Sequence, residues 1–295
     1  MSGLIRLAGS LGLLALVAVQ VGDEALQQLR GARADWLLLA AALALLQVIL
    51  SAWRWRYTAG RLAIPLAPGL AIREYYLATL INQTLPGGVL GDAQRAWRHG
   101  RGLPRKGPAF QAVVIERFSG QIAMAALALG AWLATPGLAA HTRLAVLAAA
   151  GGIMAVAALA LMAWLGRYRA SNPRRGWLYE WAMALRRGLL ARDVLPLQLG
   201  ASLLVATGHI MVFICCLQAL GASGDALLWS ALIPPVLFAM LIPFSVAGWG
   251  LREGAAALLW PLAGLPAAEG VAAAVLYGLM GLLSGLPGLL TLLRR

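Results

Sequence analysis

Long apolar runs alternate with short polar connections along this chain. Six runs approach or exceed the roughly 17–25 residues that a helix needs to cross a bilayer. They are Leu4–Val21, Trp36–Ala52, Ala109–Ala134, Leu144–Leu165, Leu195–Leu220 and Ala267–Leu293. The first run follows a single arginine and lacks a small-residue cleavage site, so we expect a retained helix rather than a signal peptide. The pattern predicts an all-α polytopic membrane protein with about six transmembrane helices.

The composition supports this class. Hydrophobic residues make up 61% of the 295 positions and charged residues 12%, against about 25% charged in soluble domains. The net charge of +13 could suit nucleic acid, but the basic residues lie in short connections between apolar runs, so we expect anionic lipid as the partner and no nucleic acid. The two cysteines are adjacent in an apolar run, about 100° apart on a helix, which argues against a disulfide. We expect no metal site and no cofactor.

The charges of the connections predict the orientation. Trp53–Arg73, Arg95–Lys106, Tyr168–Asp193 and the chain end are strongly basic. The remaining connections, Val21–Asp35, Thr135–Arg143 and Gly221–Asp225, are mixed or nearly uncharged. Because basic connections stay in the cytoplasm, both termini are predicted to be cytoplasmic.

Two related proline- and glycine-containing segments interrupt the apolar pattern, Leu85–Arg95 and Ile242–Arg252. In both, proline is followed by valine at +3, glycine at +5 and arginine at +9. Paired breaks in corresponding parts of two halves are the best sequence indication of a transport site at the bilayer midplane.

The first break lies in a segment, about 71–98, with basic residues at both ends, which a single crossing cannot explain. A re-entrant hairpin that enters from the cytoplasm explains it, and the topology then requires an opposed hairpin over about 226–265. We therefore predict an inverted-topology repeat, with two opposed re-entrant hairpins in addition to the six helices. The alternative is that each hairpin arm crosses fully.

The first repeat would cover residues 1–135. Residues 136–194 would hold the helix 144–165, which belongs to the second repeat, and an amphipathic helix at 173–193 in the cytoplasmic interface. Residues 195–295 would complete the second repeat. The alternative for 173–193 is a solvated loop.

Arg95 and Arg252 are the first candidates for a binding site. Each follows a glycine-containing turn by four residues, so its guanidinium and the N–H groups of a helix start would face one space, an arrangement that suits phosphate. The alternatives are a cytoplasmic anchor for Arg95 and pairing with Glu253 or Glu116 for Arg252.

Several neighbouring polar residues have two interpretations each. Asp92, Glu253 and the pair Glu116-Arg117 would neutralise the arginines or carry a coupling proton, or would only hold the hairpins in place. The polar run Asn82-Gln83-Thr84 would line a headgroup cavity or satisfy carbonyls freed by the proline and glycines. Tyr75 and Trp55 are interpreted as interfacial belt residues. For His209 we favour a hydrogen bond between helices over a proton relay.

Three ordered motifs resemble the flippase-like family that is named for the transmembrane region of lysylphosphatidylglycerol synthases. The motifs are Asn82-x-x-Leu85-Pro86-Gly87-Gly88-x-x-Gly91-Asp92-x-x-Arg95, then Glu116-Arg117, then Ile242-Pro243-x-Ser245-x-x-Gly248-x-Gly250-x-Arg252-Glu253. The resemblance implies a bacterial inner-membrane protein that moves a lipid between leaflets; relatives are linked to aminoacylated phosphatidylglycerol, polyprenyl-phosphate sugars or hopanoids. The synthases continue into an aminoacyl-transfer domain whereas this sequence ends at Arg295, so we do not expect the synthase itself.

Together these features give one predicted site with two groups of residues. The substrate-binding group is Arg95, Arg252, Asn82, Gly88, Gly91, Asp92, Arg117 and Ser245. The charge-partner or coupling group is Glu116 and Glu253. The predicted substrate is an anionic, phosphate-bearing lipid, and replacing Arg95 or Arg252 by alanine is expected to abolish its transport.

Two other functions stay open. The first is a membrane phosphatase or transferase that acts on a polyprenyl phosphate, for which Ser245, Glu253 and Glu116 form no convincing catalytic set. The second is a non-transporting subunit of an envelope-synthesis complex. Because no enzyme signature is found, we expect no enzyme.

Overall fold

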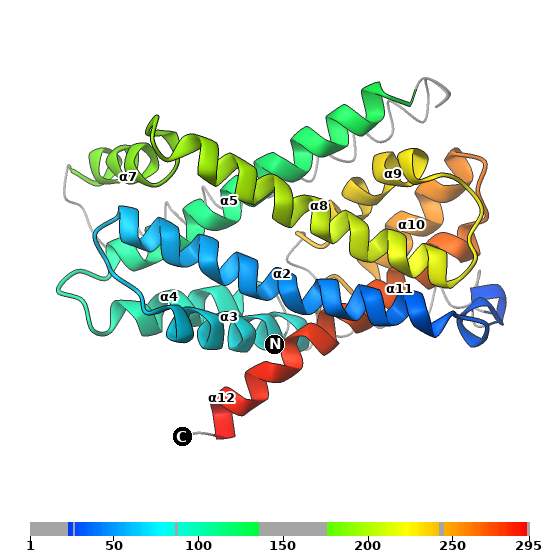
Figure 1. The fold of residues 1–295 in the computed structure, drawn as a ribbon, viewed down its shortest axis with the longest axis horizontal. Coiled ribbons are helices and arrows are strands. Elements are labelled where there is room, and N and C mark those ends of the chain that lie inside the picture. The colour runs from blue at the N-terminus through cyan, green and yellow to red at the C-terminus, as the bar shows by residue number, and fades with distance from the viewer. Residues whose placement is uncertain (1–22, 26, 86–87, 136–175, 242–244, 294–295) are drawn as a thin grey trace.

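A computed structural model of the chain describes residues 23–25, 27–85, 88–135, 176–241 and 245–293 (Figure 1). Four of its helices are long and apolar enough to cross a bilayer. They are α2 (Ala34–Arg61), α5 (Gly107–Leu133), α8 (Leu195–Ala219) and α11 (Ala267–Gly285), the last continued by the short helices η2 (Leu286–Gly288) and α12 (Leu289–Leu293). They confirm four of the predicted runs, while Leu4–Val21 and Leu144–Leu165 lie outside the described residues. The chain is an all-α polytopic membrane protein.

Helix α2 is longer than predicted. The sequence placed Trp53 at the start of a cytoplasmic connection, but the helix continues to Arg61. Arg54 is therefore not a loop residue, and its side chain is buried. The prediction was wrong because an arginine in an apolar helix is tolerated when a neighbouring helix supplies an acceptor, and α5 does so here.

Two pairs of shorter helices flank the two breaks. The first pair is α3 (Pro68–Thr84) and α4 (Leu90–Gly100), and the second is α9 (Ala226–Ala239) and α10 (Leu251–Leu262). The members of each pair pack against each other. At about 1.5 Å per residue, α4, α9 and α10 are too short to cross a hydrocarbon core of about 30 Å. Their lengths support helical hairpins in place of full crossings.

The two hairpins lie toward opposite ends of the molecule. Helices α3 and α4 lie near the end where α2 finishes, and α9 and α10 lie toward the end where α2 begins (Figure 1). Both hairpins contact the long helices, α3 through α2 and α11, and α9 through α5 and α8. Which membrane face each hairpin enters from remains a prediction.

Tight packing between the long helices depends on small and aromatic side chains. Helices α2 and α8 run side by side (Figure 1), and the central cluster buries Phe213, Trp229 and Trp260 almost completely. Ala273 and Ala274 on α11 are fully buried in the same cluster. In lipid, where apolar burial gives little driving force between helices, such close contacts supply the association energy.

The predicted linker helix is present in the described part of 173–193, as α7 (Trp177–Leu185) followed by a π-helical turn η1 (Arg186–Leu190). It packs against α5, with the ring of Trp181 edge-on to Phe110 at 6.4 Å. Leu189 is also buried. This segment is therefore a docked helix rather than a loop, and its place in the membrane interface stays a prediction.

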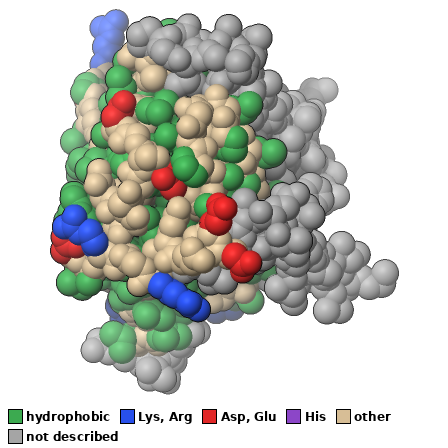
Figure 2. Space-filling model, turned by 90° about the vertical axis from the view of Figure 1, so that its right-hand side faces the viewer, with side chains coloured by type: hydrophobic (Ala, Val, Ile, Leu, Met, Phe, Trp, Pro, Cys, Tyr) green, Lys and Arg blue, Asp and Glu red, His purple; other side chains and the backbone are tan. Residues whose placement is uncertain are grey.

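Charge differs between the two ends. Figure 2 faces the end at which α2 begins, where acidic and basic side chains are both scattered among apolar ones. The connections there are of mixed charge, with Asp23, Glu24 and Asp225 beside Arg30 and Arg33. The connection from α4 to α5, at the other end, carries Arg101 and Arg105. This asymmetry supports the predicted orientation.

Candidate functional site

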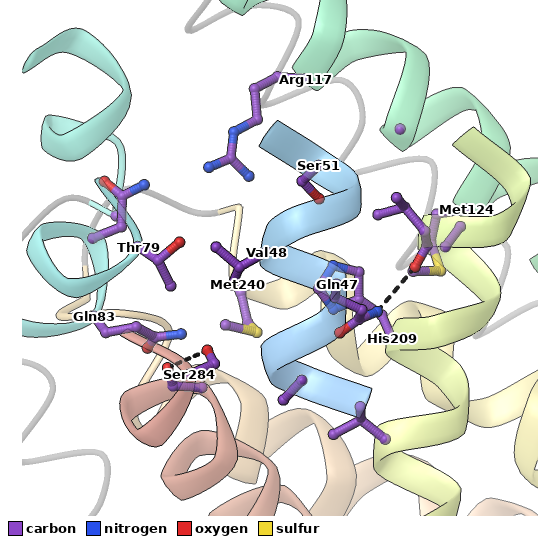
Figure 3. A pocket seen from close by; sticks show the side chains of 18 of the residues that line it. Gln47, Val48, Ser51, Thr79, Gln83, Arg117, Met124, His209, Met240 and Ser284 are labelled. Carbon is purple, nitrogen blue, oxygen red and sulfur yellow. Dashed lines mark hydrogen bonds between the residues drawn. The ribbon is translucent and has the colours of Figure 1, made fainter. Parts of the chain in front are cut away.

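A cavity of about 260 Å³ lies between the tips of the two hairpins and the long helices (Figure 3). Its walls come from α2, α3, α5, α8 and α11, and both breaks contribute, through Gly88 on one side and Met240, Leu241 and Ala247 on the other. Both hairpins therefore contribute residues to one cavity.

Polar side chains at helical spacing line much of this cavity. Gln47, Ser51 and Arg54 are separated by four and three residues, so they project from one face of α2. Tyr75, Thr79 and Asn82 do the same on α3. In otherwise apolar helices these stripes must face protein or a wet cavity, because lipid would leave the polar groups unsatisfied.

Arg95 is fully buried behind the cavity wall. Its guanidinium lies 2.7 Å from the carboxylate of Glu116 and 2.9 Å from that of Asp92. It also lies over the rings of Trp55, at 4.7 Å, and Tyr75, at 4.3 Å. Burial excludes the alternative that Arg95 is an exposed cytoplasmic anchor, and the interpretation of Tyr75 and Trp55 as belt residues was wrong, because both pack around this cation.

Glu116 connects three helices at one carboxylate. Besides Arg95 on α4, it accepts a hydrogen bond from the hydroxyl of Tyr75 at 3.2 Å and lies 3.4 Å from the guanidinium of Arg54. Arg54 also donates to the backbone carbonyl of Glu116 and to the hydroxyl of Ser119. The carboxylate therefore holds α2, α3 and α4 against α5.

Arg117 is the guanidinium of this cluster that is open to the cavity. Its side chain is 44% exposed, against 0% for Arg95 and 1% for Arg54, and it lies 2.8 Å from Asp92. Asp92 is buried, and its carboxylate is paired with both Arg117 and Arg95. Three guanidiniums against two carboxylates leave the cluster with a net charge of +1.

Asn82 bonds across the first break and also lines the cavity. Its carbonyl oxygen accepts a hydrogen bond from the backbone N–H of Gly91 at 2.7 Å, and its amide donates to Asp92 at 3.1 Å. These bonds span the first break and hold the start of α4. The side chain also lines the cavity. Gly91 lets α4 approach α3 closely, since a Cβ there would overlap the carbonyl group of Ala78.

The second hairpin carries a separate charge pair. Arg252 bonds to its neighbour Glu253, which also accepts from the N–H of Gly250 at 2.7 Å and so closes the start of α10. The guanidinium lies over the rings of Trp249 and Tyr277, and the pair is fully buried. The alternative of pairing with Glu253 is therefore observed for Arg252.

The structure divides the predicted site residues into two groups. Those that line the cavity are Asn82, Gly88, Glu116 and Arg117. Those that do not are Gly91, Asp92, Arg95, Ser245, Arg252 and Glu253. Whether any of them binds substrate remains a prediction.

The sequence interpretation missed several lining residues. They are Arg54, Gln47, Ser51, Thr79, Gln121 and Ser284, whereas Gln83 belongs to the polar run that was expected to line a cavity. The signal was available in part: the stripe on α2 and the pair Tyr277 and Ser284 on α11 repeat at helical spacing. His209, on α8, lies 2.9 Å from the hydroxyl of Tyr277, which confirms the interhelical hydrogen bond favoured from sequence.

Metal ligation finds no support in the part of the chain that the structure describes. No group of three or more His, Cys, Asp or Glu side chains is close enough to hold a metal ion among these residues. Cys215 and Cys216 are buried free thiols, as expected.

Comparison with known families agrees with the motifs. The family model described as the lysylphosphatidylglycerol synthase transmembrane region matches residues 3–288. Comparison with curated proteins and with solved structures gave no match. The match includes both hairpins, all four described spans and the charge cluster around Glu116. The chain therefore belongs to the lysylphosphatidylglycerol synthase transmembrane-region family.

Proposed function

We propose that this protein is a lipid transporter of the bacterial inner membrane that moves an anionic, phosphate-bearing lipid between leaflets. The headgroup would bind in the cavity between the hairpin tips. The family supports a lipid-related function at the membrane, and the chemistry of the cavity supports the anionic headgroup.

The observation that carries the proposal is the excess of positive charge at the cavity wall. The cluster of Arg54, Arg95 and Arg117 with Asp92 and Glu116 holds one cation more than its anions compensate. Arg117, the exposed guanidinium of the cluster, faces the cavity, so the site favours a ligand of opposite charge. A phosphate diester would complete the balance.

Arg117 is the proposed direct contact, and Arg95 is a positioning residue. The exposed guanidinium of Arg117 lines the cavity and offers a bidentate fork to phosphate oxygens. Arg95 is enclosed by Asp92, Glu116 and two aromatic rings, so it acts by orienting the carboxylates that hold its neighbours. Replacing Arg95 would then disturb transport through the shape of the site.

The enzyme alternative receives less support from the geometry. Of its three candidate groups, Ser245 and Glu253 are not among the cavity-lining residues, and Glu116 is already bonded to guanidiniums and to Tyr75. None of the three offers a free nucleophile or base at the cavity.

Translocation in proteoliposomes tests the proposal. The assay would follow acyl-labelled phosphatidylglycerol and phosphatidylcholine for wild type, Arg117→Gln and Arg192→Gln. Arg192 is an exposed arginine outside the cavity and serves as the charge-matched control. A charge-assisted hydrogen bond is worth about 1.5–3 kcal/mol, so loss of Arg117 should slow phosphatidylglycerol movement by about 10- to 100-fold.

Arg117→Lys should show intermediate activity, because the charge is kept and the bidentate geometry is lost. Phosphatidylglycerol movement that is equal in wild type, Arg117→Gln and protein-free vesicles would sink the transporter proposal. Release of inorganic phosphate from a polyprenyl diphosphate would favour the enzyme instead.

A further inference from the structure

Every acidic residue of this chain lies in the described part of the structure. The sequence contains eleven Asp and Glu residues, and the ranges outside the described residues contain none of them. The chain's carboxylates near the cavity can therefore be fully accounted for. Of the eleven, Glu116 is the one that lines the cavity.

Glu116 is not available to a ligand. It is 2% exposed, and its two oxygens are taken by Arg95, Arg54 and Tyr75. Asp92, the other carboxylate of the cluster, is bonded to Arg95 and Arg117 and is not among the lining residues. Side-chain carboxylates thus offer no counter-ion to an ammonium group in this cavity.

Neutral amide and hydroxyl groups lie away from Arg117. In Figure 3, Arg117 lies at one end of the cavity, and Gln47, Gln83 and Ser284 lie toward the other. The Oε1 atom of Gln83 is buried without a hydrogen-bond partner among the described residues, and Gly281 leaves room for its amide, since a Cβ there would lie 2.5 Å from Nε2. Amides and hydroxyls pair well with ligand hydroxyls but do not neutralise a cation.

We infer that the cavity selects an anionic lipid whose headgroup beyond the phosphate carries hydroxyls and no amine, and that it rejects aminated headgroups. The inference rests on the proposed function in one respect, that this cavity is where the headgroup binds. A phosphate at Arg117 would place the rest of the headgroup toward Gln83 and Gln47. An ammonium there would face neutral groups and a cluster of net positive charge.

We therefore expect the cavity to reject lysylphosphatidylglycerol, the lipid in the family's name. Lysylphosphatidylglycerol carries two ammonium groups against one phosphate and is therefore a cation, whereas phosphatidylglycerol is an anion with two hydroxyls. The cavity discriminates between them by charge, because no carboxylate compensates the added amines. Phosphatidylethanolamine, with one ammonium, should fall between the two.

Binding in detergent tests the selectivity without requiring transport. Isothermal titration of the purified full chain with dioctanoyl phosphatidylglycerol, phosphatidylethanolamine and lysylphosphatidylglycerol should give at least tenfold tighter binding of the first. Equal affinity for phosphatidylglycerol and phosphatidylethanolamine in wild type would overturn the inference, and this comparison needs no variant.

The variant Gln83→Glu is designed to gain binding of aminated headgroups. It adds a carboxylate of nearly unchanged size at the neutral end, and should reduce the preference for phosphatidylglycerol over phosphatidylethanolamine by at least fivefold. Gln47→Glu makes the same change from α2 and serves if the first variant does not fold. If a folded carboxylate variant leaves the ratio unchanged, the placement of the headgroup is wrong.

The two proposals fail in different ways. Selective binding of phosphatidylglycerol with no translocation in proteoliposomes would remove the transporter function and leave the selectivity. Arginine-dependent translocation of phosphatidylglycerol and phosphatidylethanolamine at equal rates would keep the function and remove the selectivity.

Discussion

Replacing Glu116 with glutamine removes one negative charge from the buried cluster while preserving the shape of the side chain. Arg54 and Arg95 then lose their shared carboxylate, and the net charge of the cluster rises from +1 to +2. The amide keeps one oxygen as an acceptor, but its NH₂ group points donors at the guanidinium on the other side, because Arg54 and Arg95 lie at different oxygens of Glu116. The loss of stability in this variant therefore measures how much the charge cluster contributes to holding the first hairpin in place.

The expected cost is large for a single isosteric change. Removing one partner of a buried ion pair costs about 3–5 kcal/mol because the remaining charge is left uncompensated. Both partners here are close to fully buried, so solvent screening gives little relief. At about 2–4 °C per kcal/mol for a chain of this size class, the unfolding midpoint in detergent should fall by roughly 10 °C.

The measurement is the thermal unfolding midpoint of the purified protein in detergent, monitored by size-exclusion chromatography after heating. Glu180→Gln is the matched control, because Glu180 is 62% exposed and the guanidinium paired with it among the described residues, on Arg105, is 3.9 Å away. Exposed pairs contribute about 0–1 kcal/mol, so the control should stay within a few degrees of wild type.

The double variant Glu116→Gln/Arg95→Gln separates charge balance from general disruption. It returns the net charge of the cluster to +1 and should recover part of the lost stability. The reasoning from charge balance is refuted if Glu116→Gln has the same unfolding midpoint as the control. It is also refuted if the double variant loses as much stability as the sum of the losses in Glu116→Gln and Arg95→Gln.

Two smaller changes test the packing around the site. Gly91→Ala places a Cβ against the carbonyl group of Ala78, so we expect a loss of about 1–3 kcal/mol and a midpoint several degrees lower, and an unchanged midpoint would contradict the close approach of α3 and α4. Tyr277→Phe removes the hydrogen bond to His209 and should cost about 1 kcal/mol, measured by the same unfolding assay, whereas a more stable variant would show that the hydroxyl is not bonded there.

Much of the fold followed from one-dimensional patterns. Apolar length alone located α5, α8 and α11, and the proline–glycine breaks located both hairpins to within a few residues. These features are local, because the bilayer thickness sets the span length and proline and glycine interrupt a helix wherever they occur. The prediction from sequence was wrong at Arg54. A buried arginine is unexpected from local sequence, but its acceptor, Glu116, lies 62 residues away along the chain.

The composition of the site was partly visible and its geometry was not. The motifs identified Arg95, Glu116 and Arg117 as functional candidates, but nothing in their order along the chain indicates which guanidinium is buried and which faces the cavity. The rotation of α4 and α5 about their axes decides this, and that rotation depends on the packing of α3 against α4 and of α2, α8 and α9 against α5.

The sequence by itself determined that this protein is a helical membrane protein with two helical hairpins interrupted by proline and glycine. It also showed that an arginine follows each interruption and that the chain has more positive than negative charge. Only the tertiary structure decided that Glu116 is the acceptor for Arg95 and Arg54, that Arg117 remains open to the cavity, and that no free carboxylate lines it. Helical periodicity fixes which residues share a face of one helix, whereas charge compensation is settled between helices, by side chains that meet only after the chain has packed.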